Sequence, residues 1–323
     1  MKNMKSFCFT THRWSAIAFG VIMLMICITG CAKAQNQRHG GAAPDKSGDS
    51  ALIELKQTVI PQFKQFIYQD TVTGKQMEYS LYIPKVYKEG QSFPLVMFIA
   101  DASCAGKGVL RPLEQGYGGL IWASESDQQR HPCFVLVPSY TAKAVDDDWS
   151  TTDEVEMTIR LLKSVVSKYG IDENRLYTTG QSMGGMMSMY YNIVHPDLFA
   201  ASIFVGCQWD TSKMGGFGTK KFFYIIAGGD EKAPKGMAAL AEVLKENKAK
   251  FNSASWSAKL PVDIHIQNDS VNTLLGKGSN INFIVFTKGS VLPNNGKGNE
   301  HMNSFDYAYK LTAVRDWLFN QTK

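Results

Sequence analysis

The pentapeptide Gly180–Gly184 (GQSMG) has the residue types of a turn that presents a nucleophilic serine. It lies between a short strand-like stretch, 176–179, and an apolar segment, 185–194, that is expected to be helical. In such a turn the glycines remove side chains that would collide, and the hydroxyl of Ser182 is raised above the sheet. The next helix directs its N-terminus at a developing oxyanion, to which the Met183 backbone N–H would donate. The motif predicts Ser182 as a nucleophile, although a glycine-rich turn can produce the same pattern.

A serine hydroxyl needs a neighbouring imidazole to accept its proton, and three histidines follow Ser182. His301 lies in a Gly/Asn-rich loop after the last apolar run and before a C-terminal helix, and we expect it to be the general base. His195 ends the helix that follows the serine, so a structural role is expected. His265 falls in the alternating stretch 262–266, which predicts an edge strand with a solvent-facing histidine.

The acid that orients the base is expected just past the end of a strand, between the serine and the histidine in sequence. Asp230 follows the apolar run FFYIIAGG and fits this position. Asp210, one strand earlier, is the second candidate. Glu231 is a third, but its longer side chain would need a different backbone position.

The second oxyanion donor is expected in the loop after the apolar run 94–100. That loop reads ADAS from Ala100, and Ala102 is the expected backbone donor.

Candidate substrate-pocket residues lie near predicted element boundaries and include aromatic side chains that could stack on a phenolic acyl group or a sugar. They are Trp149, Gln181, Gln208 and Trp209. The alternative is that the tryptophans simply cap the core. The acidic run 146–148 is interpreted as a solvated loop rather than a metal site.

The surrounding pattern indicates how these residues are positioned. Five short apolar runs are typical of parallel strands buried on both faces: 94–100, 133–138, 200–206, 222–228 and 281–287. Helices are expected between and after them at 153–169, 185–194, 235–250 and 304–321. Stretches 63–69 and 77–83 predict an antiparallel edge hairpin. The sequence therefore predicts an α/β fold with a mostly parallel central sheet and helices on both faces.

Composition excludes several classes of protein. The chain has 323 residues and is 44% hydrophobic, which is ample for a core. After loss of the first 30 residues, 31 basic residues against 29 acidic ones leave a net charge of +2, too weak to indicate a nucleic-acid partner. Three cysteines, Cys104, Cys133 and Cys207, predict no disulfide framework, and no metal or nucleotide motif occurs, so no cofactor is expected.

The N-terminus has the layout of a secretory signal: three basic residues precede an apolar run over 16–28. The run ends in ITGC, similar to a bacterial lipobox, which predicts lipidation of Cys31 and a membrane-attached protein in the cell envelope. Cleavage after Ala34 by ordinary signal peptidase is the alternative. A membrane span is disfavoured because the run is shorter than the roughly 20 residues required. We expect a signal at 1–30, a flexible tether at 31–54 and a catalytic domain at 55–323.

Several stretches together resemble the poly(3-hydroxybutyrate) depolymerase, feruloyl esterase and acetylxylan esterase branch of the α/β-hydrolases. They are YSLYIP at 79–84, FPLV at 93–96, the segment 180–206, His301 and AVRDWL at 313–318. Many such relatives carry His-Gly where this chain has Ala100-Asp101, which puts the role of Ala102 in question. The region around the Gly180–Gly184 turn is also similar to the catalytic domain of prolyl oligopeptidases. Those proteins carry an additional propeller domain, for which this sequence has no room.

The resemblance implies a carboxylesterase that acts through an acyl-serine intermediate on acyl or feruloyl esters of polysaccharides, or on polyhydroxyalkanoate-like esters. Two other functions remain open from the sequence. The same three residues would serve a serine peptidase or an acyltransferase. A lipoprotein that binds glycans or peptides without catalysis could keep the fold, but it would not need serine, acid and histidine together.

Overall fold

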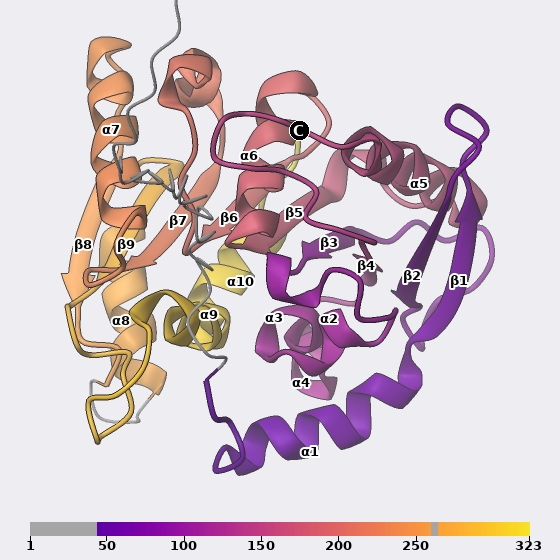
Figure 1. Ribbon diagram of the computed structural model, residues 1–323, viewed down its shortest axis with the longest axis horizontal. Helices are drawn as coiled ribbons and strands as arrows, with labels where there is room; N and C mark the ends of the chain where they lie inside the picture. The colour runs from indigo at the N-terminus through magenta and orange to yellow at the C-terminus, as the bar shows by residue number, and fades with distance from the viewer. Residues whose placement is uncertain (1–43, 260–263) are drawn as a thin grey trace, which may run out of the picture. The chain divides into compact units, whose positions relative to one another are not determined.

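The computed structural model describes residues 44–259 and 264–323, which belong to one compact unit. Within these ranges nine strands form a single sheet in the order β1-β2-β4-β3-β5-β6-β7-β9-β8 (Figure 1). The strands are β1 (Lys64–Gln69), β2 (Gln76–Tyr82), β3 (Leu95–Ile99), β4 (Phe134–Pro138), β5 (Leu176–Gln181), β6 (Ala201–Val205), β7 (Phe222–Ala227), β8 (Asn252–Trp256) and β9 (Ile281–Phe286).

Strand direction follows the predicted pattern. Strands β3 to β9 pair in parallel, whereas β1 pairs with β2 and β2 with β4 in antiparallel fashion. The predicted edge hairpin and mostly parallel sheet are therefore confirmed. The five residues of β3 (LVMFI) are all buried, because both faces of a parallel sheet are covered.

Helices cover both faces of the sheet (Figure 1). Core residues of α5, α6 and α7 pack on one face, and core residues of α1, α2, α3, α8, α9 and α10 pack on the opposite face. The helices are α1 (Ser50–Val59), α2 (Arg111–Glu114), α3 (Tyr117–Leu120), α4 (Glu125–Arg130), α5 (Asp153–Tyr169), α6 (Met183–Val194), α7 (Ala233–Glu246), α8 (Ile264–Leu275), α9 (Glu300–Lys310) and α10 (Thr312–Phe319). None of the helices in the described ranges is long and apolar enough to cross a membrane.

Two secondary-structure predictions were wrong. The edge strand expected at 262–266 is not one: α8 begins at Ile264, and residues 260–263 lie outside the described ranges. The actual edge strand is β8 (NSASW), whose polar, half-exposed residues resemble a loop in sequence. The single helix expected at 304–321 consists of α9 and α10, which meet at Leu311.

The folded domain also begins before residue 55, where the tether was expected to end. Asp49 caps α1 by accepting a hydrogen bond from the Leu52 N–H, and the Leu52 side chain is fully buried. The polar composition of 44–51 concealed this start. The rest of the expected tether and signal, up to residue 43, lies outside the described residues.

A buried ion pair connects the edge hairpin to α5. The carboxylate of Asp70, in the turn after β1, is fully buried and accepts hydrogen bonds from Arg160 at 2.6 and 2.8 Å. Thr73 donates two more. The hydrogen bonds from Arg160 hold the pKa of Asp70 well below its ordinary value, despite the opposing effect of burial.

Asp70→Asn is expected to lower the free energy of unfolding at pH 7 by about 1–3 kcal/mol, because a charge-assisted pair is broken. Since the folded pKa is depressed, the contribution of Asp70 is full above the unfolded pKa of about 4 and is lost as pH falls. The difference between variant and wild type should therefore shrink below about pH 4 in urea unfolding. Lys75→Ala, which breaks an exposed pair with Asp153, is the control and should leave stability nearly unchanged.

Candidate active site

Ser182 occupies a strained turn between β5 and α6. Its φ of 51° and ψ of −117° lie in a region that non-glycine residues rarely adopt. A Cβ on Gly180 would overlap the backbone of Gly184, and a Cβ on Gly184 would overlap the carbonyl of Ile99. Both glycines of the motif are therefore required for the close approach of α6 to β5 and β3, and strain of this kind is characteristic of functional turns.

The three residues expected to act together are in hydrogen-bonded contact. The Nε2 of His301 lies 2.9 Å from the Oγ of Ser182, and its Nδ1 lies 2.5 Å from the Oδ2 of Asp230. They come from the end of β5, the loop after β7 and the start of α9. This geometry lets the imidazole accept the serine proton while the carboxylate holds the ring.

Asp230 is a buried carboxylate, with a side chain only 4% exposed. Burial would raise its pKa, but the hydrogen bond and charge of His301 and two backbone donors outweigh it, so the pKa is lowered. The donors are the N–H groups of Lys232 and Ala233 at the start of α7, both bonded to Oδ1. One carboxylate oxygen is thus anchored by the backbone and the other faces the imidazole.

Glu300 is a site residue that sequence reasoning missed. It is buried, and its two carboxylate oxygens accept hydrogen bonds from the backbone N–H groups of Gly229, at 3.0 Å, and Gly289, at 2.9 Å. Gly229 precedes Asp230 and Glu300 precedes His301, so this side chain joins the loops of acid and base. A carboxylate directly before the base histidine and a double glycine before the acid were the only sequence signals.

A second unpredicted group lies behind the serine turn. Asp101, buried at 3% exposure, accepts hydrogen bonds from the Ser103 N–H at 2.6 Å and from the side-chain amides of Gln115 and Gln181. The Gln181 amide also donates to Gln115 at 2.7 Å. The Asp101 carboxylate thus ties the loop after β3 to the residue preceding Ser182.

The two expected oxyanion donors border this arrangement. Met183 is the first residue of α6, so its backbone N–H has no acceptor within the helix. Ala102 begins the 3-10 turn Ala102–Cys104, which Asp101 caps. The carboxylate of Asp101 thus fixes the backbone of the loop that would present the second donor.

The predicted pocket residues fall into two groups. The rings of Trp149 and Trp209 lie 4.1 Å apart between centroids and both contact Tyr190, while the buried indole N–H of Trp209 has no hydrogen-bond partner among the described residues. Gln208 is half-buried and donates to Asp147. Gln181, by contrast, is buried in the Asp101 network, where it contributes to support of the turn rather than to a pocket wall.

The remaining candidates lie elsewhere. Asp210 caps the exposed turn Thr211–Lys213, with the Ser212 N–H as its donor, and its pKa is lowered by these hydrogen bonds. His195 pairs with Glu156 at 3.0 Å at the end of α6. His265 is exposed in the first turn of α8, and Glu231 is exposed beside Asp230. None of these side chains contacts Ser182 or His301 within the described residues.

The protein has an α/β-hydrolase fold, and its site brings a serine, a histidine and an aspartate into hydrogen-bonded contact. A model of the prolyl oligopeptidase family matches residues 142–244, which contain the serine turn and Asp230 but not His301. No curated protein is similar enough to this chain to count as a match.

Solved structures of the same fold include esterases. A thermostable esterase has a TM-score of 0.66 and 24% identity over 82% of this chain, which spans 64% of the length of that structure. The feruloyl esterase module from Clostridium thermocellum, solved with sinapinate, has a TM-score of 0.52 and 13% identity over 84% of this chain and 92% of its own. The enterobactin esterase from Shigella flexneri has a TM-score of 0.50 and 11% identity over 79% of this chain and 58% of its own. The predicted α/β-hydrolase fold is thus confirmed.

Proposed function

We propose that the protein is a carboxylic ester hydrolase that works through an acyl-serine intermediate, with Ser182 as nucleophile, His301 as base and Asp230 as acid. The observation that carries the proposal is the continuous hydrogen-bonded series from Asp230 through His301 to Ser182. The esterases among the structures of the same fold support ester substrates.

In the first half of the reaction, Ser182 Oγ attacks the ester carbonyl while His301 Nε2 takes its proton. The backbone N–H of Met183 and a donor from the loop at Ala102 stabilise the negative charge on the carbonyl oxygen. The tetrahedral intermediate collapses, the ester C–O bond breaks, and the protonated imidazole gives its proton to the departing alcohol. The acyl group is then bound to Ser182.

In the second half, a water molecule takes the place of the alcohol. His301 Nε2 accepts a proton from this water, whose oxygen attacks the acyl carbonyl. As the second tetrahedral intermediate collapses, the bond between Ser182 Oγ and the acyl carbon breaks, the protonated imidazole gives its proton to Oγ, and the carboxylic acid is released. Asp230 remains ionised throughout and holds the imidazole with Nε2 facing the serine. The residues in contact supply every proton transfer, so the proposal requires no cofactor.

The test is hydrolysis of p-nitrophenyl acetate, p-nitrophenyl butyrate and methyl ferulate by the purified protein. A fluorophosphonate probe should label Ser182, as identified by mass spectrometry of the labelled peptide. Methyl ferulate as the preferred substrate would support the feruloyl branch and a stacking role for Trp149 and Trp209. Absence of both turnover and labelling would reject a serine enzyme and favour a binding protein.

A peptidase is the second candidate, because the matched family is that of the prolyl oligopeptidases. The same assays with prolyl p-nitroanilide peptides separate the two. A kcat/KM for anilides above that for esters would favour the peptidase. Products formed in the presence of an added alcohol would reveal acyl transfer as a new ester.

We further propose that the protein is exported and attached to a bacterial membrane through a lipid on Cys31. This rests on the apolar run at 16–28 and the ITGC sequence, both outside the described residues. Globomycin treatment of expressing cells should cause the precursor to accumulate, and Cys31→Ser should do the same. If globomycin has no effect on cleavage of the precursor but Ala34→Leu blocks it, ordinary signal peptidase releases the protein instead.

A further inference from the structure

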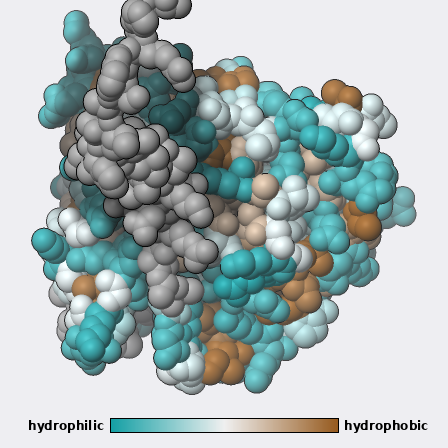
Figure 2. Space-filling view, in the orientation of Figure 1, coloured by the Kyte–Doolittle hydropathy of each residue, from teal (hydrophilic) through white to brown (hydrophobic). Residues whose placement is uncertain are grey.

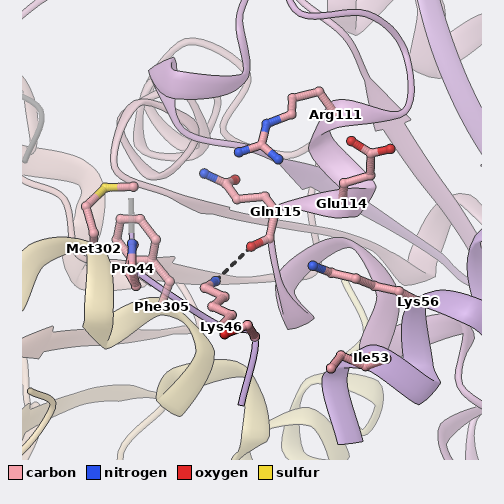
Figure 3. Close-up of a pocket in the computed structure, with 10 residues that line it drawn as sticks. Pro44, Lys46, Ile53, Lys56, Arg111, Glu114, Gln115, Met302 and Phe305 are labelled. Atoms are coloured by element: carbon pink, nitrogen blue, oxygen red, sulfur yellow. Dashed lines mark hydrogen bonds between the residues drawn. The ribbon is translucent and has the colours of Figure 1, made fainter. Parts of the chain in front are cut away.

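A cavity of about 290 Å³ is lined by residues of α1, α2 and α9 and of the segment before α1 (Figure 3). Met302, directly after His301, forms part of its lining. Gln115, whose side chain is bonded to Gln181 and Asp101 behind the serine turn, forms another part. Phe305, a third lining residue, has its ring centroid 5.1 Å from that of His301, so this side chain joins the cavity wall to the proposed base.

Three cationic side chains line this cavity: Lys46, Lys56 and Arg111. They come from the segment before α1, from α1 and from α2, and Figure 3 shows their charged ends directed towards a common space. Ile53, 41% exposed on α1, adds an apolar side chain to the lining. On the face of the molecule seen in Figure 2, hydrophobic residues are interspersed with hydrophilic ones.

The positive charge of the cavity is only partly neutralised. Lys46 pairs with Asp306 at 2.6 Å and donates to the Gln115 carbonyl at 2.7 Å. Neither Lys56 nor Arg111 has an ion pair or a side-chain hydrogen bond within the described residues. Arginine and lysine bind carboxylates and phosphates through charge-assisted hydrogen bonds, so these two side chains offer donors to an anion in the cavity.

The electrostatics of Lys56 agree with this geometry. Partial burial is the main cause that lowers the pKa of Lys56, and the charges of Lys46 and Arg111 lower it further. The nearby carboxylates of Asp306 and Glu114 act in the opposite direction without restoring the pKa to its ordinary value. A bound anion would remove this repulsion.

We propose that this cavity binds an anionic group of the substrate, so that the enzyme prefers esters that carry a carboxylate or phosphate over neutral esters of the same size. The inference rests on the proposed ester hydrolase function and adds the charge of its substrate. Arg111, with its planar set of donors, binds the anion, and Lys56 adds a second positive charge. Neither side chain takes part in bond making or breaking, so the rate at which neutral esters are hydrolysed does not depend on them.

The test compares matched substrates. On the acyl side, p-nitrophenyl hydrogen glutarate is paired with p-nitrophenyl valerate; on the alcohol side, 4-carboxyphenyl acetate is paired with 4-methylphenyl acetate. For the wild type, kcat/KM for the charged member of at least one pair should exceed that for the neutral member by about tenfold or more, a preference that salt weakens. Arg111→Ala and Lys56→Ala should remove the preference and leave kcat/KM for the neutral esters within about twofold.

Controls separate a specific site from general charge. Arg111→Lys should retain part of the preference, and Lys85→Ala, an exposed lysine outside the cavity lining, should retain all of it. Inhibition of the hydrolysis of the charged substrates by glutarate or by inorganic phosphate shows whether the cavity binds a carboxylate or a phosphate. The inference is overturned if the wild type shows no preference for the charged ester in either pair and Arg111→Ala changes neither rate. Hydrolysis of the neutral esters in the same experiment would still support the proposed function.

Binding provides a readout that does not depend on turnover. Calorimetric titration of the Ser182→Ala variant with glutarate, phosphate and 4-carboxyphenyl acetate should show binding that Arg111→Ala abolishes. If no ester is hydrolysed but an anion binds through Arg111, the proposed function and the substrate assignment fail, and only anion binding by the cavity stands. If none of the three binds, the cavity assignment fails.

Discussion

Ser182→Ala is expected to lower kcat for p-nitrophenyl butyrate by a factor on the order of 10⁴ or more. The substitution removes the only oxygen that lies within hydrogen-bond distance of His301 Nε2 among the described residues. Without it no acyl-enzyme forms, and the residual rate comes from water attack assisted by the oxyanion donors. Measurement of initial rates, together with loss of fluorophosphonate labelling, checks the prediction.

His301→Ala should reduce kcat by a similar factor, because serine and base act as one unit and their effects are not additive. His195→Ala is the matched control, since that imidazole pairs with Glu156 at the surface and should leave kcat within about twofold. Ser182→Ala should fold normally, because its hydroxyl makes no other hydrogen bond with the described residues and the strained backbone is retained. Activity above about a hundredth of wild type in this variant would point to another nucleophile.

The residues of the serine turn could be predicted because their chemistry is local. Gly180 and Gly184 are required by contacts within a few residues of Ser182 and with β3. Five consecutive residues therefore contain the whole motif. Asp230 and His301 are predicted less directly, from their order along the chain and from their places after apolar runs, and the structure places both in contact with one another. Parallel strands bring their carboxyl ends to one edge, which makes such position arguments effective.

The supporting residues could not be found in this way. Asp101 meets Gln181 across 80 positions, and Glu300 reaches Gly229 across 71. These contacts depend on side-chain directions that only the assembled fold defines, and buried carboxylates have no periodic signal. The same reasoning explains the strand errors, because the polar edge strand β8 is stabilised by pairing with β9 rather than by its own composition.

The loop after β3, which contains Asp101 and Ala102, has a role that its sequence does not indicate and its structure does. In sequence, Ala100-Asp101 is only a departure from the His-Gly of many relatives. In the structure, Asp101 uses its carboxylate to cap the 3-10 turn at Ala102 and to accept amide donors from behind Ser182. A different residue type thus fulfils the requirement for a fixed loop beside the nucleophile.

Asp230→Asn is expected to lower kcat by about 10⁴ with little change in fold. The Asn carbonyl oxygen can still accept from the Lys232 and Ala233 N–H groups, so the anchoring of the loop survives. The amide NH₂, however, would face His301 Nδ1 as a donor and impose the tautomer with a proton on Nε2. The imidazole then cannot accept the proton of Ser182.

Asp210→Asn is the matched control, because this carboxylate caps an exposed turn and should leave kcat unchanged within about twofold. The acid dependence of kcat/KM adds a second check. Because the pKa of Asp230 is held below its ordinary value, the carboxylate is ionised at every pH above about 4. If the wild-type activity falls on acidification while the pH is still above about 4, protonation of a group other than Asp230 causes the loss. Near-normal activity of Asp230→Asn, with a large loss in Asp210→Asn, would transfer the role of the acid to Asp210 and require the loop after β6 to move towards His301.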